Sequence, residues 1–367
     1  MHLATSGEAA HSPGEVVAQE TDNLAVRTAA LERRIREIAP DVILCHALGD
    51  PAELNAIRYL PRSIPRVMVL HSSTLATYRG SRAVRDHVSV TVAISHRIEE
   101  DLLHSYQFQA ACVQFVPHGI DIATFAATAP AKNGNARLRL LSHGRIDNNS
   151  KGLFLLPEIL SQLARQTSDW ECTISGDGPD LPELRKRVAR LGLSDRVHFT
   201  GWTPSEDVPA LMHQNDVFLF PSKFEGYPIG LIEAMAGGCL PIASNLPGIT
   251  DRIIEDGVNG LLVPVGNADA YVGHILELLA DRPRLAALRQ RAQESVSRYS
   301  LDWMAEQYYQ LFCDVLARPG KLAEPEALGD VKLAKGLRPA WWYGLPEPMK
   351  NQLRMAREKL RASFPIP

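Results

Sequence analysis

Short apolar runs alternate with helix-like stretches along most of the chain, and this alternation constrains the fold more than any other feature of the sequence. A run that is apolar at nearly every position suits a strand that helices cover on both faces of a parallel sheet. The pattern therefore predicts an α/β protein built from two doubly wound, Rossmann-like domains. The runs occupy residues 41–46, 66–71, 88–95, 113–117, 137–143, 170–175, 196–200, 216–220, 240–244 and 261–264.

The composition changes along the chain and predicts where these domains begin and end. Residues 1–20 are small and polar without apolar periodicity, which predicts a disordered start. The segment AATAPAKNGNA, residues 126–136, lacks any period and predicts a linker. The expected parts are a first domain over 21–125, a second domain over 137–300, a last helix over 301–318 that crosses back to the first domain, and a basic, aromatic tail over 319–367.

Two helix starts in the second domain carry a recognisable capping pattern. Asp180 with Glu183, and Thr203 with Glu206, each place a capping side chain three residues before a carboxylate. These pairs predict helices that begin just after Asp180 and Thr203, each capped by that side chain.

The composition excludes several classes of protein. The chain has 39 Lys and Arg against 42 Asp and Glu, and a net charge of -3 argues against a general nucleic-acid binder. The five cysteines are widely spaced without a Cys-x-x-Cys pair, so we expect reduced, mostly buried thiols rather than disulfides or a zinc site. No apolar run approaches the roughly 18 residues of a membrane-spanning helix, and no secretory signal is visible. We therefore expect a cytoplasmic protein.

Candidate binding residues lie in a loop that follows a strand of the second domain. Residues 216–220 lead into PSKFEGYPIGLIEAMAGG, where the loop opens a helix near Gly230. Free backbone N–H groups at a helix start suit an anionic ligand. Glu225 on the loop and Glu233 in the first helical turn can accept paired hydrogen bonds from sugar hydroxyls, so the segment fits a nucleotide sugar. Two solvated surface glutamates would show the same spacing.

Two further loops leave strands at the same sheet edge, where open α/β sheets bind ligands. After residues 137–143, Gly144 bounds a loop on which Arg145 and Lys151 can converge on a diphosphate and neutralise it without a metal. The alternative is an ordinary basic pair on a turn. After residues 170–175, Gly176 and Gly178 permit either a close backbone approach to a ligand or simply a tight turn.

These motifs resemble those of the retaining glycosyltransferases of the GT-B fold, in the large group numbered family 4. The segments GRIDNNSKG, ISGDGP, VHFTGW, DVFLFPSKFEGYPIGLIEAMAGG and EDGVNGLLVP follow the family pattern in order, and the resemblance covers about residues 41–317. It implies that Arg145 and Lys151 bind the donor diphosphate, and that Glu225 and Glu233 contact the donor sugar and the nucleotide ribose. The further donor-binding positions that it implies are Gly144, Gly176, Gly178, Gly226, Gly230 and Leu231.

The resemblance is weaker in the first half of the chain. In VLHSS, His71 resembles a family histidine near the reacting sugar, although a strand-end histidine held by hydrogen bonds would look the same. His118 replaces the usual Asn before the linker, and Asp251 is a shorter carboxylate than the usual Glu. Only about forty residues precede the first predicted strand, so we expect a shortened N-terminal, acceptor-side domain or a start placed too far downstream.

The resemblance implies transfer of a sugar, of hexosyl type, from a nucleotide diphosphate sugar to an acceptor hydroxyl with retention of the anomeric configuration. Arg145 and Lys151 would stabilise the leaving diphosphate, while Glu225 and His71 would act at the sugar. We expect no metal and no further cofactor, because no Asp-x-Asp pair ends a strand. The expected acceptor is a glycan or lipid-linked precursor of a cell-surface polysaccharide or glycolipid. Alternatives are a nucleotide-sugar-binding partner with little turnover and a GT-B epimerase or phosphorylase.

The tail has its own composition. Residues 320–367 hold nine Lys and Arg against five Asp and Glu, a surplus of +4. Trp341, Trp342 and Tyr343 precede a pattern whose apolar positions share one helical face rimmed by basic residues, as suits a lipid headgroup region. This hypothesis places the protein at the inner face of the membrane. The alternative is a tail that folds back and covers the first domain. The apolar positions are Met349, Leu353, Ala356 and Leu360.

Overall fold

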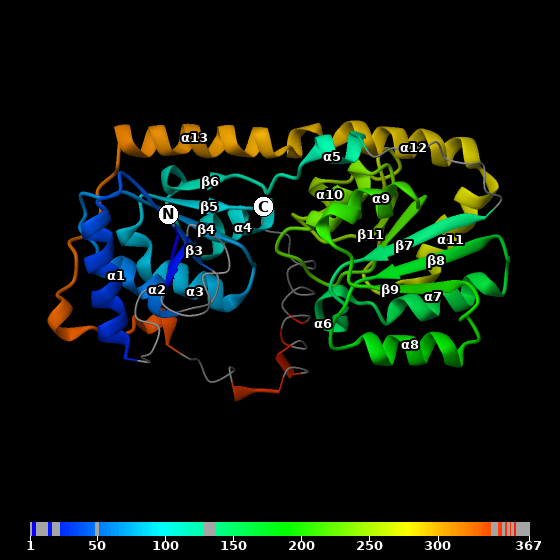
Figure 1. The fold of residues 1–367 in the computed structure, drawn as a ribbon, viewed down its shortest axis with the longest axis horizontal. Helices are drawn as coiled ribbons and strands as arrows, with labels where there is room; N and C mark the ends of the chain where they lie inside the picture. The colour runs from blue at the N-terminus through cyan, green and yellow to red at the C-terminus, as the bar shows by residue number, and fades with distance from the viewer. Residues whose placement is uncertain are drawn as a thin grey trace. The chain divides into compact units, whose positions relative to one another are not determined.

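The computed structural model describes residues 2–4, 14–16, 23–47, 51–127, 137–338, 344–346, 349–350, 353 and 356. The chain divides into two compact units, Met1–Pro117 with Ala305–Leu345 and His118–Met304 with Pro346–Pro367. Each unit is built around a parallel sheet with helices, which confirms the predicted α/β class and the two Rossmann-like domains (Figure 1).

The first unit holds a four-stranded parallel sheet in the order β3-β4-β5-β6. All five residues of the strand β4 are buried, which explains its unbroken apolar run. Asn23 caps the first helix by accepting from the backbone N–H of Ala25 at 3.0 Å. The elements are β1 (His2–Ala4), β2 (Gly14–Val16), α1 (Leu24–Ile38), β3 (Ile43–Ala47), α2 (Pro51–Ala56), β4 (Arg66–Leu70), α3 (Leu75–Val84), β5 (Val90–Ala93), α4 (His96–Glu100) and β6 (Val113–Phe115).

Of the start of the chain, which was expected to be disordered over residues 1–20, the structure describes only residues 2–4 and 14–16. Strands β1 and β2 pair in parallel, with His2 opposite Gly14 and Ala4 opposite Val16. Each strand has three residues, which is too short for an apolar period to show in the sequence.

The second unit holds a six-stranded parallel sheet in the order β12-β11-β10-β7-β8-β9. Every strand that the sequence predicted is present. The elements are α5 (Ile122–Ala127), β7 (Leu138–His143), α6 (Asn148–Lys151), α7 (Leu155–Ala164), β8 (Trp170–Ser175), α8 (Leu181–Arg190), β9 (Val197–Gly201), α9 (Val208–His213), β10 (Val217–Phe220), α10 (Ile229–Ala236), β11 (Leu240–Ser244), β12 (Leu261–Val263), α11 (Ala268–Ala280) and α12 (Arg282–Ser295).

Two apolar cores sandwich this sheet. Along β10, Val217 and Leu219 join the core under α7 and α8, whereas Phe218 and Phe220 join the core under α9 and α10 (Figure 1). Because successive side chains of a strand point to opposite faces, a strand buried on both faces must be apolar at every position. This requirement produces the continuous runs in the sequence.

The strand order creates a switch point beside β7. From β7 the chain moves outward through β8 to β9, then returns to place β10 on the other side of β7. The loops after β7 and β10 therefore leave the sheet in opposite directions, and the space between them at the carboxyl edge is where doubly wound sheets bind ligands.

The boundary between the units lies earlier than the expected linker. It falls between Pro117 and His118, because Ile120 and Phe125 pack in a core of the second unit. Residues 128–136 of the expected linker lie outside the described residues. Helix α13 (Leu301–Ala317) begins in the second unit and belongs to the first from Ala305 onward.

Both expected helix caps are wrong, although a helix does begin just after Asp180. Helix α8 begins after Asp180, but the Asp180 side chain makes no capping bond and instead accepts from the backbone N–H of Asn148 at 2.7 Å. After Thr203, a 3₁₀ turn over Ser205–Asp207 precedes α9, and the Thr203 hydroxyl lies 2.6 Å from that of Ser175. Contacts to distant loops outcompete the local caps at both positions.

The tail begins on the first unit. The backbone N–H of Ala323 donates to the carbonyl of Asp86 at 2.8 Å, and that of Glu326 donates to the carbonyl of Arg58 at 2.9 Å. Residues 341–343 and Leu360 lie outside the described residues, whereas Met349, Leu353 and Ala356 are described and exposed. Within the described part of the chain, no helix is long and apolar enough to cross a membrane.

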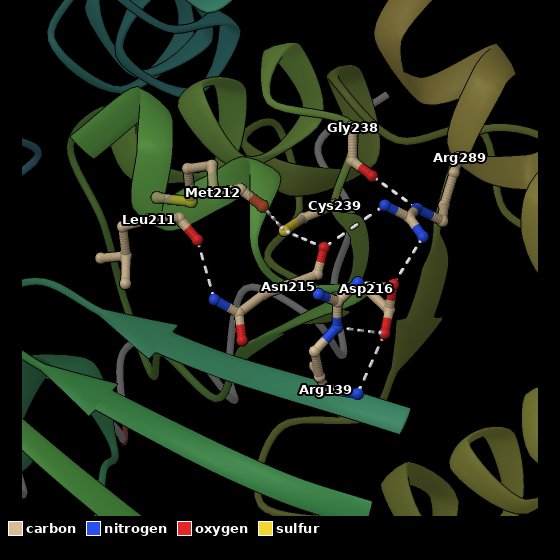
Figure 2. Close-up of polar contacts among 8 residues, drawn as sticks. All are labelled: Arg139, Leu211, Met212, Asn215, Asp216, Gly238, Cys239 and Arg289. Carbon is tan, nitrogen blue, oxygen red and sulfur yellow. Dashed lines mark hydrogen bonds and ion pairs between the residues drawn. The ribbon is translucent and has the colours of Figure 1, made fainter. Parts of the chain in front are cut away.

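Asp216, which directly precedes β10, ties the amino ends of β7 and β10 to α12 (Figure 2). Its Oδ1 accepts from Arg289 at 2.7 Å and from the Arg139 guanidinium at 3.1 Å, and its Oδ2 accepts from Arg139 Nε at 3.1 Å. Arg289 also donates to the carbonyl of Gly238 at 2.6 Å. The carboxylate is therefore shared by two cations from different elements.

The cysteines are free, as expected, but only Cys172 and Cys239 are buried. Cys45 and Cys112 are half-buried, and Cys313 is exposed. Burial raises the pKa of the Cys172 thiol to about 12, so this thiol stays protonated at neutral pH.

Candidate functional site

A pocket of about 160 Å³ opens at the carboxyl ends of β7 and β10, which is the switch point of the sheet. Both loops that diverge from this point contribute to its wall, together with the first turn of α10. Five of the residues predicted for donor binding line it. These are Gly144, Arg145, Lys151, Gly230 and Glu233.

The loop after β7 is shaped by its glycines and by the neighbouring loop. Gly144 has φ +134°, in the region that favours glycine, and it turns the chain at the strand end. Asp147 then caps the short helix α6 by accepting from the backbone N–H of Asn149 at 2.8 Å. At the other end of α6, Gly152 has φ +64°, and a Cβ there would overlap the Pro221 carbonyl. Helix α6 is thereby held between the loops after β8 and β10.

Lys151, at the end of α6, lines the pocket and forms an ion pair with Glu225, which is not part of the pocket wall. Its Nζ donates to both oxygens of Glu225, at 2.8 and 3.0 Å. Ser222 donates a third hydrogen bond to the same carboxylate at 2.7 Å. Glu225 is 7% exposed, so the buried carboxylate is charge-compensated and satisfied.

Arg145 presents an uncompensated charge to the pocket. Its side chain is exposed and lines the pocket, and among the described residues it makes no hydrogen bond or ion pair. Since the Lys151 charge is matched by Glu225, the positive field of the site comes chiefly from Arg145.

The first turn of α10 supplies a backbone donor. The N–H groups of Ile229 and Leu231 bond to Tyr227 and Pro228 within the turn, at 3.1 and 3.0 Å. The Gly230 N–H, by contrast, has no protein acceptor among the described residues, and Gly230 lines the pocket. A free N–H at a helix start adjacent to Arg145 suits an anion.

Glu233 lines the pocket one turn further along α10. Burial raises the pKa of its carboxyl group. No hydrogen bond from the described residues stabilises its charge. A partly desolvated acceptor of this kind suits hydroxyl groups of a ligand.

The other predicted residues have different places. Gly176 and Gly178 approach the backbone of the neighbouring loop, since a Cβ at either would overlap the carbonyl of Gly144 or Ile146. Leu231 is fully buried in the core, so its side chain does not reach the pocket. Gly226 is half-buried and is not part of the pocket wall, and neither is Asp251.

His71 lies in the first unit, at the end of β4. Its Nε2 is 2.8 Å from Nδ1 of His46, the penultimate residue of the adjacent strand β3. The two rings therefore share one proton between the facing nitrogens. His46 was not predicted as a site residue, although the sequence marks it: it is a polar residue that closes one apolar strand run, as His71 closes the next.

Three further residues of the second unit lie at or near the pocket and were not predicted from the sequence. His143 closes the run of β7 and lines the pocket, as does Ser222 on the loop after β10. Lys223 donates from Nζ to the carbonyl of Asn148 at 3.0 Å, and burial lowers its pKa. The signal for His143 was its place at the carboxyl end of a strand, one residue before Gly144.

Comparisons with known proteins agree with this geometry. Family models match the chain as "Glycosyl transferases group 1" over residues 128–295 and as "Glycosyltransferase Family 4" over residues 11–124. The phosphatidyl-myo-inositol mannosyltransferase of Mycolicibacterium smegmatis is 32% identical over 274 residues, which cover 72% of this chain and 68% of the relative. The alpha-D-kanosaminyltransferase of Streptomyces kanamyceticus is 25% identical, covering 74% and 73% of the two chains.

Solved structures share the fold. HepE from Anabaena, in complex with UDP and glucose, superposes with a TM-score of 0.69 at 20% identity, covering 82% of this chain and 86% of that one. Two parallel-sheet units, a pocket at the switch point of the second and the matched sequences of both halves lead to one assignment. The chain belongs to the group 1 glycosyltransferases of the GT-B fold.

Proposed function

We propose that the protein transfers a hexosyl group from a nucleotide diphosphate sugar to an acceptor hydroxyl, with retention of the anomeric configuration. The observation that carries this proposal is the convergence of Arg145, Lys151 and the free Gly230 N–H on one pocket. These donors suit a diphosphate, whose charge grows as the bond to the sugar breaks. The UDP and glucose in the HepE structure support a nucleotide sugar as donor.

In the proposed mechanism, binding and electrostatics supply most of the catalysis. Arg145 and the α10 start stabilise the departing diphosphate, because they are already oriented before the reaction begins. Glu225, held by Lys151 and Ser222, orients the sugar, and Glu233 accepts from the ribose. His71 is proposed to act at the reacting sugar.

The proposal is tested by incubating the protein with UDP- and GDP-linked hexoses and following nucleotide release. NMR of the sugar product, or of the sugar released to water, gives its anomeric configuration. Release with retention supports the proposal, and release with inversion contradicts the stereochemical part. Binding of a nucleotide sugar without any release would favour the alternative, a nucleotide-sugar-binding partner with little turnover.

We expect transfer to continue in the presence of a chelator such as EDTA. The described residues contain no group of three or more His, Cys, Asp or Glu placed to hold a metal ion, and Arg145 supplies positive charge at the pocket. The measurement is the initial rate of nucleotide release with and without EDTA. Loss of transfer in EDTA that magnesium or manganese restores would overturn this prediction.

Replacing Glu233 by Gln is expected to stabilise the free protein and weaken donor binding. Burial raises the pKa of Glu233 in the folded state. Above that pKa, ionisation of the buried carboxyl group lowers the free energy of unfolding. This cost vanishes below the pKa that Glu233 has in the unfolded chain, because the group is then protonated in both states. Thermal unfolding should therefore show a higher midpoint for Glu233→Gln at pH 7 and no difference in acid. The exposed Glu206, changed to Gln, is the control.

Donor affinity gives the second readout for Glu233. The ribose should bind more weakly to the amide of Glu233→Gln than to the carboxylate of Glu233, because the amide has one acceptor oxygen whereas the carboxylate has two. The dissociation constant of the nucleotide sugar should rise while turnover at saturating donor is retained. The opposite pattern, lower turnover with intact affinity, would show that the ribose is the wrong partner.

For the acceptor we propose a glycan or lipid-linked hydroxyl of a cell-surface precursor, met at the cytoplasmic face of the membrane. The lipid named in the phosphatidyl-myo-inositol mannosyltransferase supports this class. If residues 319–367 contribute membrane contact, the full chain should co-sediment with anionic vesicles and a chain ending at Arg318 should not. Equal behaviour of the two chains would assign the tail a purely structural role.

A further inference from the structure

His143 begins a chain of hydrogen bonds that runs from the pocket into the sheet. The residue lines the pocket at the end of β7. Its Nδ1 lies 3.0 Å from the hydroxyl of Ser175, at the end of β8, and that hydroxyl lies 2.6 Å from the hydroxyl of Thr203, just after β9. Ser175 is fully buried, so water does not compete for these bonds.

This chain leaves one ring nitrogen of His143 for a ligand. Nδ1 is engaged by Ser175, whereas Nε2 has no partner among the described residues and is not sealed from solvent. Burial lowers the pKa of His143, so the ring is neutral at neutral pH and carries a single N–H. When Thr203 donates to Ser175 and Ser175 donates to Nδ1, that proton must lie on Nε2.

The surroundings of Nε2 favour a ligand that accepts hydrogen bonds. Gly144 and the uncompensated Arg145 directly follow His143, and Gly230, whose N–H has no acceptor among the described residues, lines the same pocket. An anion in this pocket selects the tautomer of His143 that carries its proton on Nε2. This tautomer fixes the direction of donation in the hydrogen bonds from Thr203 through Ser175 to His143. A neutral imidazole adds a donor without adding a further like charge beside Arg145 and Lys151.

We propose that His143 is a binding residue for the donor diphosphate, to which its Nε2–H donates, and that Ser175 and Thr203 are positioning residues that set its tautomer. This inference rests on the proposed function, and it adds to it a contact that the family motifs do not name. The competing role is structural: His143 would simply join β7 to β8 through Ser175.

Two substitutions of His143 separate these roles. The amide of His143→Gln extends toward the place of Nε2, whereas that of His143→Asn reaches the place of Nδ1 and so keeps the Ser175 contact. Calorimetry with UDP and GDP, and with UMP and GMP, reports the part of the affinity that depends on the second phosphate. We expect His143→Asn to weaken diphosphate binding about tenfold or more and monophosphate binding much less, with His143→Gln retaining more of the diphosphate affinity.

The outcomes distinguish this inference from the proposed function. If His143→Asn binds the diphosphates as tightly as the unchanged protein, or loses mono- and diphosphates equally, the structural role is right and the proposal is overturned. If the unchanged protein binds none of the four nucleotides, the proposed function itself fails. Monophosphate binding also shows that each variant is folded.

Thr203 tests the tautomer. Thr203→Val keeps the shape of the side chain and removes the hydroxyl, so Ser175 loses its partner 2.6 Å away. We expect a several-fold loss of diphosphate affinity, restored largely by Thr203→Ser, while the exposed Thr200→Val on the preceding strand β9 has no effect. In ¹⁵N NMR the bound His143 ring should show its proton on Nε2. A proton on Nδ1 in the bound state would overturn the proposal.

Discussion

Arg145→Ala is expected to lower the rate constant of sugar transfer about a hundredfold to a thousandfold. The guanidinium is exposed at the pocket and makes no hydrogen bond or ion pair among the described residues. Its removal should therefore take positive charge away from the site of the diphosphate without disturbing the fold. The unfolding midpoint should stay unchanged. Single-turnover kinetics at saturating donor, with Arg165→Ala as a surface control, measure the effect. A loss below about tenfold with unchanged donor affinity would show that Arg145 is ordinary surface charge.

Lys151→Ala should behave differently although both residues were predicted for one role. It is expected to slow transfer as strongly, and also to lower the unfolding midpoint. Glu225, which is 7% exposed, would keep its hydrogen bond from Ser222 but lose the Lys151 cation. Removing one partner of a buried ion pair is destabilising, because the other charge is left uncompensated. If Lys151→Ala has the same unfolding midpoint as the unchanged protein, the ion pair contributes little to the stability of the fold.

Asp216→Ala is expected to destabilise the protein by about 3–5 kcal/mol, the typical cost of leaving buried partners unpaired. The carboxylate serves two cations at once, Arg139 and Arg289, whose side chains are 19% and 14% exposed. Hydrogen bonding to Asp216 raises the pKa of Arg139, whereas burial lowers that of Arg289 to about 10. Removing the anion would leave both charges in a poorly solvated place.

Urea unfolding at pH 7 measures this effect. The control is Glu183→Ala, which removes an exposed helical pair with Arg187 and should cost less than about 0.5 kcal/mol. A double change of Asp216 and Arg289 to apolar residues should recover part of the loss, because one unpaired charge disappears. Asp216→Ala with the stability of the Glu183 control would contradict the role assigned to the network in Figure 2.

The sheets were predictable because burial on both faces leaves a local mark. Residues 216–220 are apolar at four of five positions, and this run suffices to identify β10. The predicted strands also gave the location of the pocket residues, because loops that follow parallel strands meet at the carboxyl edge of the sheet. These residues are Arg145, Lys151 and Gly230. The fold and the general place of the pocket were therefore accessible from sequence.

The connections within the site were not accessible, because they join residues far apart in the chain. The pair of Lys151 and Glu225 spans 74 positions, and the bond of Asn148 to Asp180 spans 32. The local pattern at Asp180 predicted a helix cap. The Asp180 side chain makes no cap because it accepts a hydrogen bond from Asn148, on the loop after β7. Leu231 was placed at the site from the family motif alone, and its side chain faces the core instead.

The ion pair of Lys151 with Glu225 bears on how readily the spent nucleotide departs. Two free cations would hold a nucleoside diphosphate strongly, and release rather than bond breaking would then limit each cycle. With Lys151 matched by an acid 2.8 Å away, Arg145 is the uncompensated cation of the pocket wall. A nucleoside diphosphate carries its full charge once the sugar has gone, and one uncompensated cation attracts it less than two would. In the proposed reaction, the ion pair of Lys151 with Glu225 therefore eases release of this product.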